Sequence, residues 1–265
     1  MTIHPTSIID ENAKIADDVT IGPFCTVGAN VSIGARTKLI SHVVIDGYTK
    51  IGENNTIYPF ASIGLPPQDL KFKGEKSELI IGNDNTIREY VTIHPGTADD
   101  NNITVVGNNN LLMIQSHIAH DCIVGNNIIL ANGATLAGHV KVGDKSTIGG
   151  LSAVHQFVRI GHHAFVGGLS AATKDIPPFT IASSPRSTLD GLNLVGLRRK
   201  GFDKTTIQAM QKALKYVFFS AEGSLLERVD HVEKENQGHS EIQDIVDFVR
   251  GSERGLCLPD EGKIK

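Results

Sequence analysis

The polar residues best suited to chemistry lie close together in the stretch LLMIQSHIAHDCIVG, residues 111–125. His117 and His120 are three residues apart, and Asp121 directly follows His120. A neutral histidine can take a proton from a hydroxyl group, and a neighbouring carboxylate can fix its tautomer and stabilise the imidazolium. A backbone N–H can stabilise the oxyanion that forms when the hydroxyl attacks a carbonyl carbon. His120, Asp121 and Gly138 can fill these three roles.

These residues stand within a repeat, because an aliphatic side chain recurs every six residues along about two-thirds of the chain, with a one-residue shift of phase before Val106. A period of six matches neither an α-helix nor a single long strand. It is typical of a parallel β-helix with one short strand and one turn in each hexad. The series comprises Ile3, Ile9, Ile15, Ile21, Val27, Ile33, Leu39, Ile45, Ile51, Ile57, Ile63, Ile81, Ile87, Ile93, Val106, Leu112, Ile118, Val124, Leu130, Leu136, Val142, Ile148, Val154, Ile160 and Val166.

Two further positions of the hexad are biased. Glycine often follows the aliphatic residue, as at Gly34, Gly52 and Gly82, and we expect it to permit the backbone angles of a corner. Small or branched residues often occupy the fifth position, where Cys25 and Cys122 fall. We therefore predict that both cysteines are buried small hydrophobes. The chain has 3 cysteines without metal-like spacing, so we expect neither a disulfide framework nor a zinc knuckle.

Two segments interrupt the repeat, and the chain changes character after it. Residues 65–79 carry Pro, Gly and charge, and residues 96–104 are polar and turn-forming, so we predict that both are loops that leave a coil. We predict a β-helix domain over residues 1–180 and a C-terminal helical domain with a second, smaller core over 181–265. Its helices are expected at about 190–200, 203–218, 224–236 and 240–251, with Gly201 as a stop signal and Asp203 as an N-cap.

The hexads resemble those of the left-handed parallel β-helix acyltransferases, a family in which three hexads form one coil of a triangular prism. The handedness and the triangle come from this resemblance. Residues 18 apart would then stack on successive coils, with strands about 4.8 Å apart. His139 would lie one coil after His120, His94 roughly one coil before His117, and His155 with Gln156 roughly one coil after His139, so the histidines would cluster.

More specific motifs narrow the resemblance to one branch of that family. The stretches IGPFCTVG, SHVVIDGYTKIG, QDLKFKGE, ANGATLAGHV, IGGLSAVHQFVRIG and NLVGLRRKGF are similar, over essentially the whole chain, to enzymes of lipid A synthesis. Those enzymes transfer an (R)-3-hydroxyacyl chain from acyl carrier protein to the 3-hydroxyl of UDP-N-acetylglucosamine. The hexads begin at Ile3, which disfavours the sister N-acyltransferases because those begin with a uridine-binding domain.

The resemblance also implies roles for single residues. His120 would be the general base, Asp121 would orient it, and Gly138 would supply the oxyanion N–H. Arg198 and Lys200 would contact the acidic carrier protein. No metal and no dissociable cofactor are implied, because the donor brings its own 4'-phosphopantetheine. The implied substrate-binding residues are Asp69, Lys71, His94, His117, His139, His155, Gln156, Gly168, Asn193 and Arg199.

The resemblance carries three further expectations about substrate and assembly. Gly168 matches the position that limits acyl length, and a glycine there leaves room for a long chain of about fourteen carbons. Val195 stands where some relatives have a Glu that contacts the nucleotide, which leaves open whether the acceptor carries a 3-hydroxyl or a 3-amino group. The family forms homotrimers with active sites between subunits, so we expect a homotrimer.

Composition and charge exclude several function classes. The net charge of −4 argues against a nucleic-acid partner, and no apolar stretch is long enough for membrane insertion. The N-terminus lacks a secretory signal, so the cytoplasm is the expected compartment. Two alternatives remain: a zinc-dependent hydratase with three histidine ligands, like the hexapeptide-repeat carbonic anhydrases, and a structural or ice-binding solenoid. Ice-binding surfaces use repeated Thr ranks, and His-x-x-His spacing does not resemble the carbonic anhydrase pattern.

Overall fold

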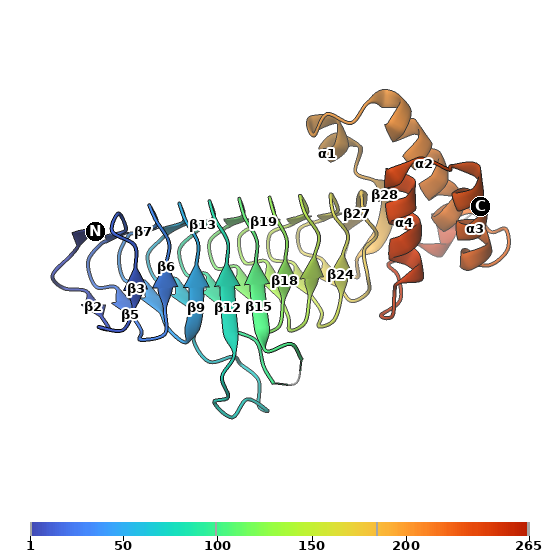
Figure 1. The fold of residues 1–265 in the computed structure, drawn as a ribbon. Coiled ribbons are helices and arrows are strands. Elements are labelled where there is room, and N and C mark those ends of the chain that lie inside the picture. The colour runs from blue at the N-terminus through green and yellow to red at the C-terminus, as the bar shows by residue number, and fades with distance from the viewer. Residues whose placement is uncertain (1, 99, 184, 264–265) are drawn as a thin grey trace.

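The computed structural model describes residues 2–98, 100–183 and 185–263. It is a three-sided prism of short strands with helices at its C-terminal end (Figure 1). Through most of the prism, successive strands enter sheets A, B and C in turn, so each full coil gives one strand to each face. We call the corners between faces the A–B, B–C and C–A edges. The predicted parallel β-helix is confirmed.

Most of the strands are two residues long, and their pairing is parallel until the last strand of sheet A, which is antiparallel. Sheet A contains Thr2–Ile3 (β1), Thr20–Ile21 (β4), Lys38–Leu39 (β7), Thr56–Ile57 (β10), Thr86–Ile87 (β13), Leu111–Leu112 (β16), Ile129–Leu130 (β19), Thr147–Ile148 (β22), Phe165–Val166 (β25), Thr180–Ser183 (β27) and Thr188–Leu192 (β28). Sheet B contains Ile8–Ile9 (β2), Thr26–Val27 (β5), Val44–Ile45 (β8), Ser62–Ile63 (β11), Thr92–Ile93 (β14), His117–Ile118 (β17), Thr135–Leu136 (β20), Ala153–Val154 (β23) and Ala171–Ala172 (β26). Sheet C contains Lys14–Ile15 (β3), Ser32–Ile33 (β6), Tyr48–Ile51 (β9), Glu78–Ile81 (β12), Ile103–Val106 (β15), Ile123–Val124 (β18), Lys141–Val142 (β21) and Arg159–Ile160 (β24).

The six-residue repeat sets the register of these sheets. Ile118 pairs with Leu136, one coil of 18 residues later, and the aliphatic side chains of successive coils form the interior of the prism. Burial of these branched side chains is the main driving force for folding. Cys25 and Cys122 are also buried in this column, as predicted.

The hexad glycines have a different role from the one expected. Among the described glycines that follow the aliphatic residue, only Gly64 has a positive φ, +78°. The left-handed corner residue lies two positions later and is usually not glycine, as at Asp121 (φ 58°) and His139 (φ 63°). A Cβ on Gly107 would lie 2.6 Å from the carbonyl oxygen of Gly125 on the next coil. These glycines are needed because neighbouring coils approach closely, not for their backbone angles.

Both predicted loops leave the prism at the B–C edge, and Figure 1 shows them projecting beside β12 and β15. The first follows β11 and the second follows β14. Strand β12 begins at Glu78 and β15 at Ile103, so the last two residues of each predicted loop are strand instead. They pair with each other, Glu78 with Ile103, which extends sheet C outwards at this edge.

Four α-helices follow the prism in the described chain: Leu194–Arg199 (α1), Lys204–Phe219 (α2), Leu225–Glu235 (α3) and Ser240–Arg250 (α4), with a short 3-10 turn at Glu261–Lys263 (η1). The Asp203 side chain accepts from Thr206 N and caps α2 as predicted, and Gly201 has φ +84° just after α1. The prediction of helix from residue 190 is wrong, because residues 190–192 belong to strand β28, which pairs with β27.

The C-terminal helices do not have a core of their own. The buried hydrophobic residues of the prism and of α2, α3 and α4 belong to one continuous cluster, contrary to the expected second core. Strand β27 continues sheet A past residue 180, and the domain boundary proposed there stays a prediction. Among the helices of the described chain, none combines the length and the apolar character that crossing a membrane requires.

Candidate active site

The predicted histidine cluster lies along the B–C edge. The corners after β17, β20 and β23 stack on one another, because His139 N donates to His120 O (3.0 Å) and Phe157 N donates to Gly138 O (3.1 Å). Asp121, His139 and Phe157 therefore occupy equivalent left-handed corner positions on three successive coils. The two loops leave the same edge, so the repeat and its interruptions together build one site.

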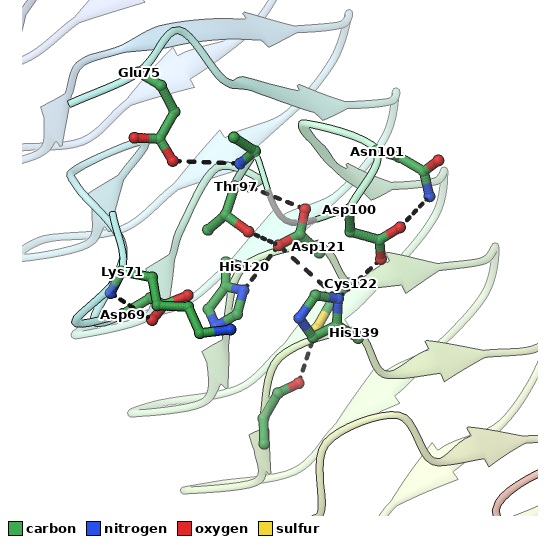
Figure 2. A network of polar contacts seen from close by, with 12 residues as sticks. Asp69, Lys71, Glu75, Thr97, Asp100, Asn101, His120, Asp121, Cys122 and His139 are labelled. Carbon is green, nitrogen blue, oxygen red and sulfur yellow. Dashed lines mark hydrogen bonds and ion pairs between the residues drawn. The ribbon is translucent and has the colours of Figure 1, made fainter. Parts of the chain in front are cut away.

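His120 and Asp121 form a tightly held pair at the centre of this edge (Figure 2). Nδ1 of His120 lies 2.8 Å from Oδ2 of Asp121. The Asp121 carboxylate, only 3% exposed, also accepts from Thr97 N (2.9 Å) and Thr97 Oγ1 (2.7 Å). The second loop thus holds the carboxylate, and the carboxylate fixes His120 with its proton on Nδ1. Nε2 is then an acceptor that has no partner among the described residues.

The electrostatics of this pair favour a basic histidine. The hydrogen bond to Asp121 raises the pKa of His120, burial opposes this, and the charges of Asp121 and Asp69 add to the increase. Burial raises the pKa of Asp121, but the hydrogen bonds from His120 and Thr97 outweigh it and lower that pKa overall. Asp121 therefore stays ionised at neutral pH, which stabilises the imidazolium form of His120.

His139 is held beside the pair by different partners. Its Nδ1 lies 2.8 Å from Oδ2 of Asp100 and 4.0 Å from Oδ2 of Asp121. Its ring stacks on Phe157 at 4.3 Å between centroids and meets the edge of His120 at 5.0 Å. These contacts leave Nε2 of His139 for a further partner.

His117 and His94 form a second, neutral pair nearby. Nδ1 of His117 lies 2.6 Å from the Thr92 hydroxyl. The imidazole rings of His94 and His117 meet edge to face, with their centroids 5.0 Å apart. Burial, followed by the charges of His117 and His120, lowers the pKa of His94 to about 4. Burial likewise lowers the pKa of His117. In the described chain, Nδ1 of His94 is buried without a hydrogen-bond partner.

Gly138 lies directly against the His120 ring. A Cβ at this position would come within 2.5 Å of Cε1 of His120, so a side chain there would displace the ring. Within the described part of the chain, the Gly138 N–H donates to no protein acceptor. A free backbone donor beside a histidine base is the arrangement that oxyanion stabilisation needs.

The first loop brings Asp69 and Lys71 beside the same ring (Figure 2). The Lys71 N–H donates to Oδ1 of Asp69 at 3.0 Å. The two loops are joined by Ala98 N, which donates to the Glu75 carboxylate at 3.3 Å. Residues of both loops, including Asp69, Lys71 and Thr97, line a pocket of about 300 Å³.

His155 and Gln156 lie on the B–C edge and His94 contacts His117, as expected, although neither His155 nor His94 is in exact register with the histidine on the neighbouring coil. The residue one coil after His139 is Phe157, and the residue equivalent to His117 one coil earlier is Thr92. No contact joins His155 to another histidine in the described chain. Its partner is Arg254, whose Nη2 lies 2.8 Å from Nδ1 of His155.

Other predicted residues are on different edges of the same chain. Gly168 lies at the A–B edge, where its backbone stacks on Gly150. Asn193 lies near the C–A edge, where its amide donates to His163 O (3.0 Å) and its side-chain oxygen caps α1 through Gly196 N. The last turn of α1 contains Arg198 and Arg199, and its C-cap is Lys200. One chain therefore does not gather all the predicted site residues.

Sequence reasoning missed five residues that contact the site: Thr92, Thr97, Asp100, Phe157 and Arg254. Phe157 could have been found, because it is 18 residues after His139. Thr97 and Asp100 belong to a loop outside the repeat, and no spacing rule connects them with His120 or His139. Arg254 comes from beyond α4, and nothing periodic links it to the prism.

The same cluster bears on the zinc alternative. In the described chain, one group of possible ligands lies close enough to share a metal ion, namely His120, Asp121 and His139, with ligand atoms within 4.8 Å. It holds two histidines and one carboxylate, not the three histidines that the alternative requires. This arrangement does not favour a three-histidine zinc site.

Comparison with known proteins agrees with this geometry. The family model "Udp N-acetylglucosamine O-acyltransferase; Domain 2" matches residues 175–257, and the bacterial transferase hexapeptide model matches residues 1–35 and 103–138. A Rickettsia canadensis protein named acyl-[acyl-carrier-protein]–UDP-N-acetylglucosamine O-acyltransferase is 58% identical over 96% of this chain and 97% of its own length. A protein of that name from Thermodesulfovibrio yellowstonii is 52% identical over 96% and 98%.

A solved structure extends the agreement to the fold. The Acinetobacter baumannii enzyme LpxA is 47% identical and superposes with a TM-score of 0.93 over 97% of this chain and 99% of its own. The prism is accordingly a left-handed parallel β-helix, as expected from the resemblance. The chain belongs to the acyl-[acyl-carrier-protein]–UDP-N-acetylglucosamine O-acyltransferase family.

Proposed function

We propose that this chain transfers an (R)-3-hydroxyacyl group from acyl carrier protein to the 3-hydroxyl of UDP-N-acetylglucosamine, the first step of lipid A synthesis. The observation that carries the proposal is the His120–Asp121 pair, held by Thr97, in a chain of this family. The names of the relatives supply the donor and the acceptor. The donor brings its own phosphopantetheine, and the proposal needs neither a metal nor another cofactor.

The geometry suggests a single-base mechanism. Asp121 holds the Nδ1 proton of His120, so Nε2 accepts the proton of the sugar 3-hydroxyl as its oxygen attacks the thioester carbonyl. The Gly138 N–H stabilises the resulting oxyanion. When the tetrahedral intermediate collapses, the C–S bond breaks and the imidazolium returns its proton to the departing thiolate. The products are the O-acyl sugar nucleotide and carrier protein with a free thiol.

The other polar residues of the B–C edge are proposed to bind substrate. Neutral His94 and His117 offer hydrogen bonds without placing a charge beside the base. His139, His155 and Gln156 extend the same edge towards the C-terminal end. Asp69 and Lys71 approach from the first loop, where they can contact the acyl hydroxyl and the acceptor sugar.

We further propose that the protein is a homotrimer with shared sites. Gly168, Asn193 and Arg199 lie away from the B–C edge, so they reach His120 only if a second copy supplies them. The A–B edge supports this, because it exposes Phe24, Phe60, Tyr90, Leu151 and Leu169 to solvent in one chain. Arg198 and Lys200 then lie where the acidic carrier protein can dock. The proposed compartment is the cytoplasm.

Two details of the substrates follow from single residues. Gly168 leaves the acyl groove open, so the donor chain is long, about fourteen carbons. A tenfold preference for a ten-carbon donor would contradict this. Val195, which is exposed, cannot make the polar contact of a Glu, so the 3-amino analogue of the acceptor remains the second substrate to assay.

The deciding experiment measures acyl transfer from 3-hydroxyacyl carrier protein to UDP-N-acetylglucosamine by wild type and His120→Ala. We expect kcat to fall by about 10²–10⁴ in the variant, with unchanged melting temperature and assembly mass. His4→Ala, on the exposed first coil, is the matched control and should keep full activity. Product only with the 3-amino sugar would change the acceptor, and inactivity with both sugars would refute the proposal. A monomeric mass would refute the trimer.

A further inference from the structure

The segment that follows α4 returns to the last coil of the prism and is held there by Asp175. This carboxylate is 1% exposed and accepts from Arg159 N (2.8 Å), Arg159 Nε (3.0 Å) and Ser252 Oγ (2.9 Å). Its backbone also pairs with the segment, because Asp175 N donates to Gly255 O and Cys257 N donates to Asp175 O. A buried carboxylate with this many donors fixes the path of the chain.

Arg159 reinforces the same anchor from the side of α4. Its Nη2 donates to Phe248 O at 2.8 Å, and its guanidinium lies over the Phe248 ring at 4.4 Å. The two ends of residues 248–257 are therefore fixed to the prism. Gly255, with φ +80°, makes a turn that other residues rarely adopt.

This anchored segment carries Arg254 to His155. Nη2 of Arg254 lies 2.8 Å from Nδ1 of His155, and a guanidinium can only donate a hydrogen bond. Nδ1 must therefore accept, which places the proton of a neutral His155 on Nε2. The competing arrangement is also present, because Nδ1 lies 3.3 Å from the carbonyl oxygen of Gln156 and could donate to it if protonated. Arg254 thus decides between two tautomers.

His155 lies on the edge that carries the candidate active site. It follows β23 on the B–C edge, one coil beyond Ala137, which neighbours Gly138. Adjacent coils are about 4.8 Å apart, so His155 lies close to the reacting region without touching the His120 pair. With the proton on Nε2, His155 offers a donor there, and the Arg254 guanidinium adds a positive charge.

We infer that Arg254 is a positioning residue that holds His155 as a hydrogen-bond donor for an anionic oxygen of the acceptor. In the proposed function, on which this inference rests, that oxygen belongs to the diphosphate of the sugar nucleotide. Arg254 acts on substrate binding and not on the proton transfer at His120. Its loss therefore changes KM for the acceptor more than kcat.

The test compares Arg254→Met and Arg254→Lys with the control Arg250→Met in the full chain. Arg250 is four residues away and pairs with Asp230 and Glu233 on α3, without contact to His155. We expect Arg254→Met to raise KM for UDP-N-acetylglucosamine about tenfold with kcat within about threefold. Arg254→Lys, which keeps a cationic donor, should recover most of this loss, and Arg250→Met should leave KM unchanged.

A second readout does not depend on turnover. Nitrogen-15 NMR of the imidazole ring should show His155 protonated on Nε2 in the wild type and shifted towards Nδ1 in Arg254→Met. An unchanged KM in Arg254→Met, an equal rise in Arg250→Met, or an Nδ1-protonated His155 in the wild type would each overturn the inference. If the wild type transferred no acyl group, the proposed function would fail, while the NMR result would still decide whether Arg254 sets the tautomer.

Discussion

The C–A and B–C edges of this prism are built from the same hexad, yet the asparagine corners of the C–A edge hold coils together, whereas the B–C edge carries the candidate active site. Asn127 at the C–A edge and Asp121 at the B–C edge have nearly the same φ, 56° and 58°. At the C–A edge, asparagine amides bond from coil to coil: Asn85 Nδ2 donates to Asn55 Oδ1 (3.0 Å), and Asn110 N donates to Asn85 Oδ1 (2.9 Å). The backbone conformation of a corner therefore does not determine whether that edge binds substrate.

The asparagine corners of the C–A edge differ from the B–C edge in where their polar groups find partners. The buried asparagines of the C–A edge bond to one another and to neighbouring carbonyl groups, so they hold successive coils together. At the B–C edge, Nδ1 of His94 and the N–H of Gly138 have no partner in the described chain, while His120 is oriented by Asp121. Groups left open beside an oriented base are available to a substrate. Substitutions at the two edges should therefore separate stability from activity.

The largest effect on activity, apart from loss of the base, is expected for Asp121→Asn. The amide keeps the shape of the carboxylate but no longer stabilises the imidazolium or fixes the tautomer, so kcat should fall by up to about 10⁴ and no further than in His120→Ala. The matched control is Asp144→Asn at the C–A edge, where the retained side-chain oxygen can still accept from Asn126 N. Steady-state kinetics should show near-normal kcat for the control; equal losses would remove the distinction between the edges.

Asn85→Ala at the C–A edge should instead lower stability and leave activity intact. It removes bonds to Asn55 and Gly107 and leaves the Asn110 N–H without its acceptor. Because these groups are buried, the free energy of unfolding should fall by about 3 kcal/mol, measured by chemical denaturation. Asn12→Ala on the exposed first coil is the control, with an expected change below about 0.5 kcal/mol. A drop in kcat per folded Asn85→Ala enzyme would contradict the assignment of this edge to structure.

Substitution of two glycines by alanine, which adds one methyl group, should also separate activity from stability. A Cβ on Gly138 would meet the His120 ring at 2.5 Å, and the ring can swing away only by leaving Asp121. We expect Gly138→Ala to lower kcat about a hundredfold with little loss of stability. A Cβ on Gly107 would instead meet the Gly125 backbone at 2.6 Å, so Gly107→Ala should lower the melting temperature and spare kcat. Thermal unfolding and kinetics of both variants test this, and the reverse pattern would refute it.

The sequence predicted the repeat, the buried column and the His120–Asp121 pair, because each depends on local spacing. Cys122 is buried as expected since its position follows from the period of six. The contacts of Thr97, Asp100 and Arg254 could not be predicted, because the path of a loop and of the C-terminal segment depends on tertiary packing. The role of the hexad glycines was misjudged for a similar reason, since their constraint comes from the neighbouring coil.

Gly168 shows a further limit. Its motif placed it among the site residues, but the prism puts it on the A–B edge. The edge of each residue depends on how many hexads make a coil and on where the loops leave, and the period alone specifies neither. A motif can therefore identify residues that share a function. It does not show whether those residues lie together in one chain.

The smallest expected effect is a shift in the pH dependence of the reaction, which tests the electrostatics of His120. His120 must be neutral to accept a proton, and its carboxylate neighbours raise its pKa, so kcat/KM should fall as the pH drops through a value above the ordinary 6.5 of histidine. Asp69 contributes to this increase through its charge, so Asp69→Asn should move the acidic limb of the pH profile to lower pH. Asp10→Asn on the first coil should leave the limb in place. A limb that moved upwards in Asp69→Asn, or that moved equally in both variants, would mean that a group other than His120 controls the profile.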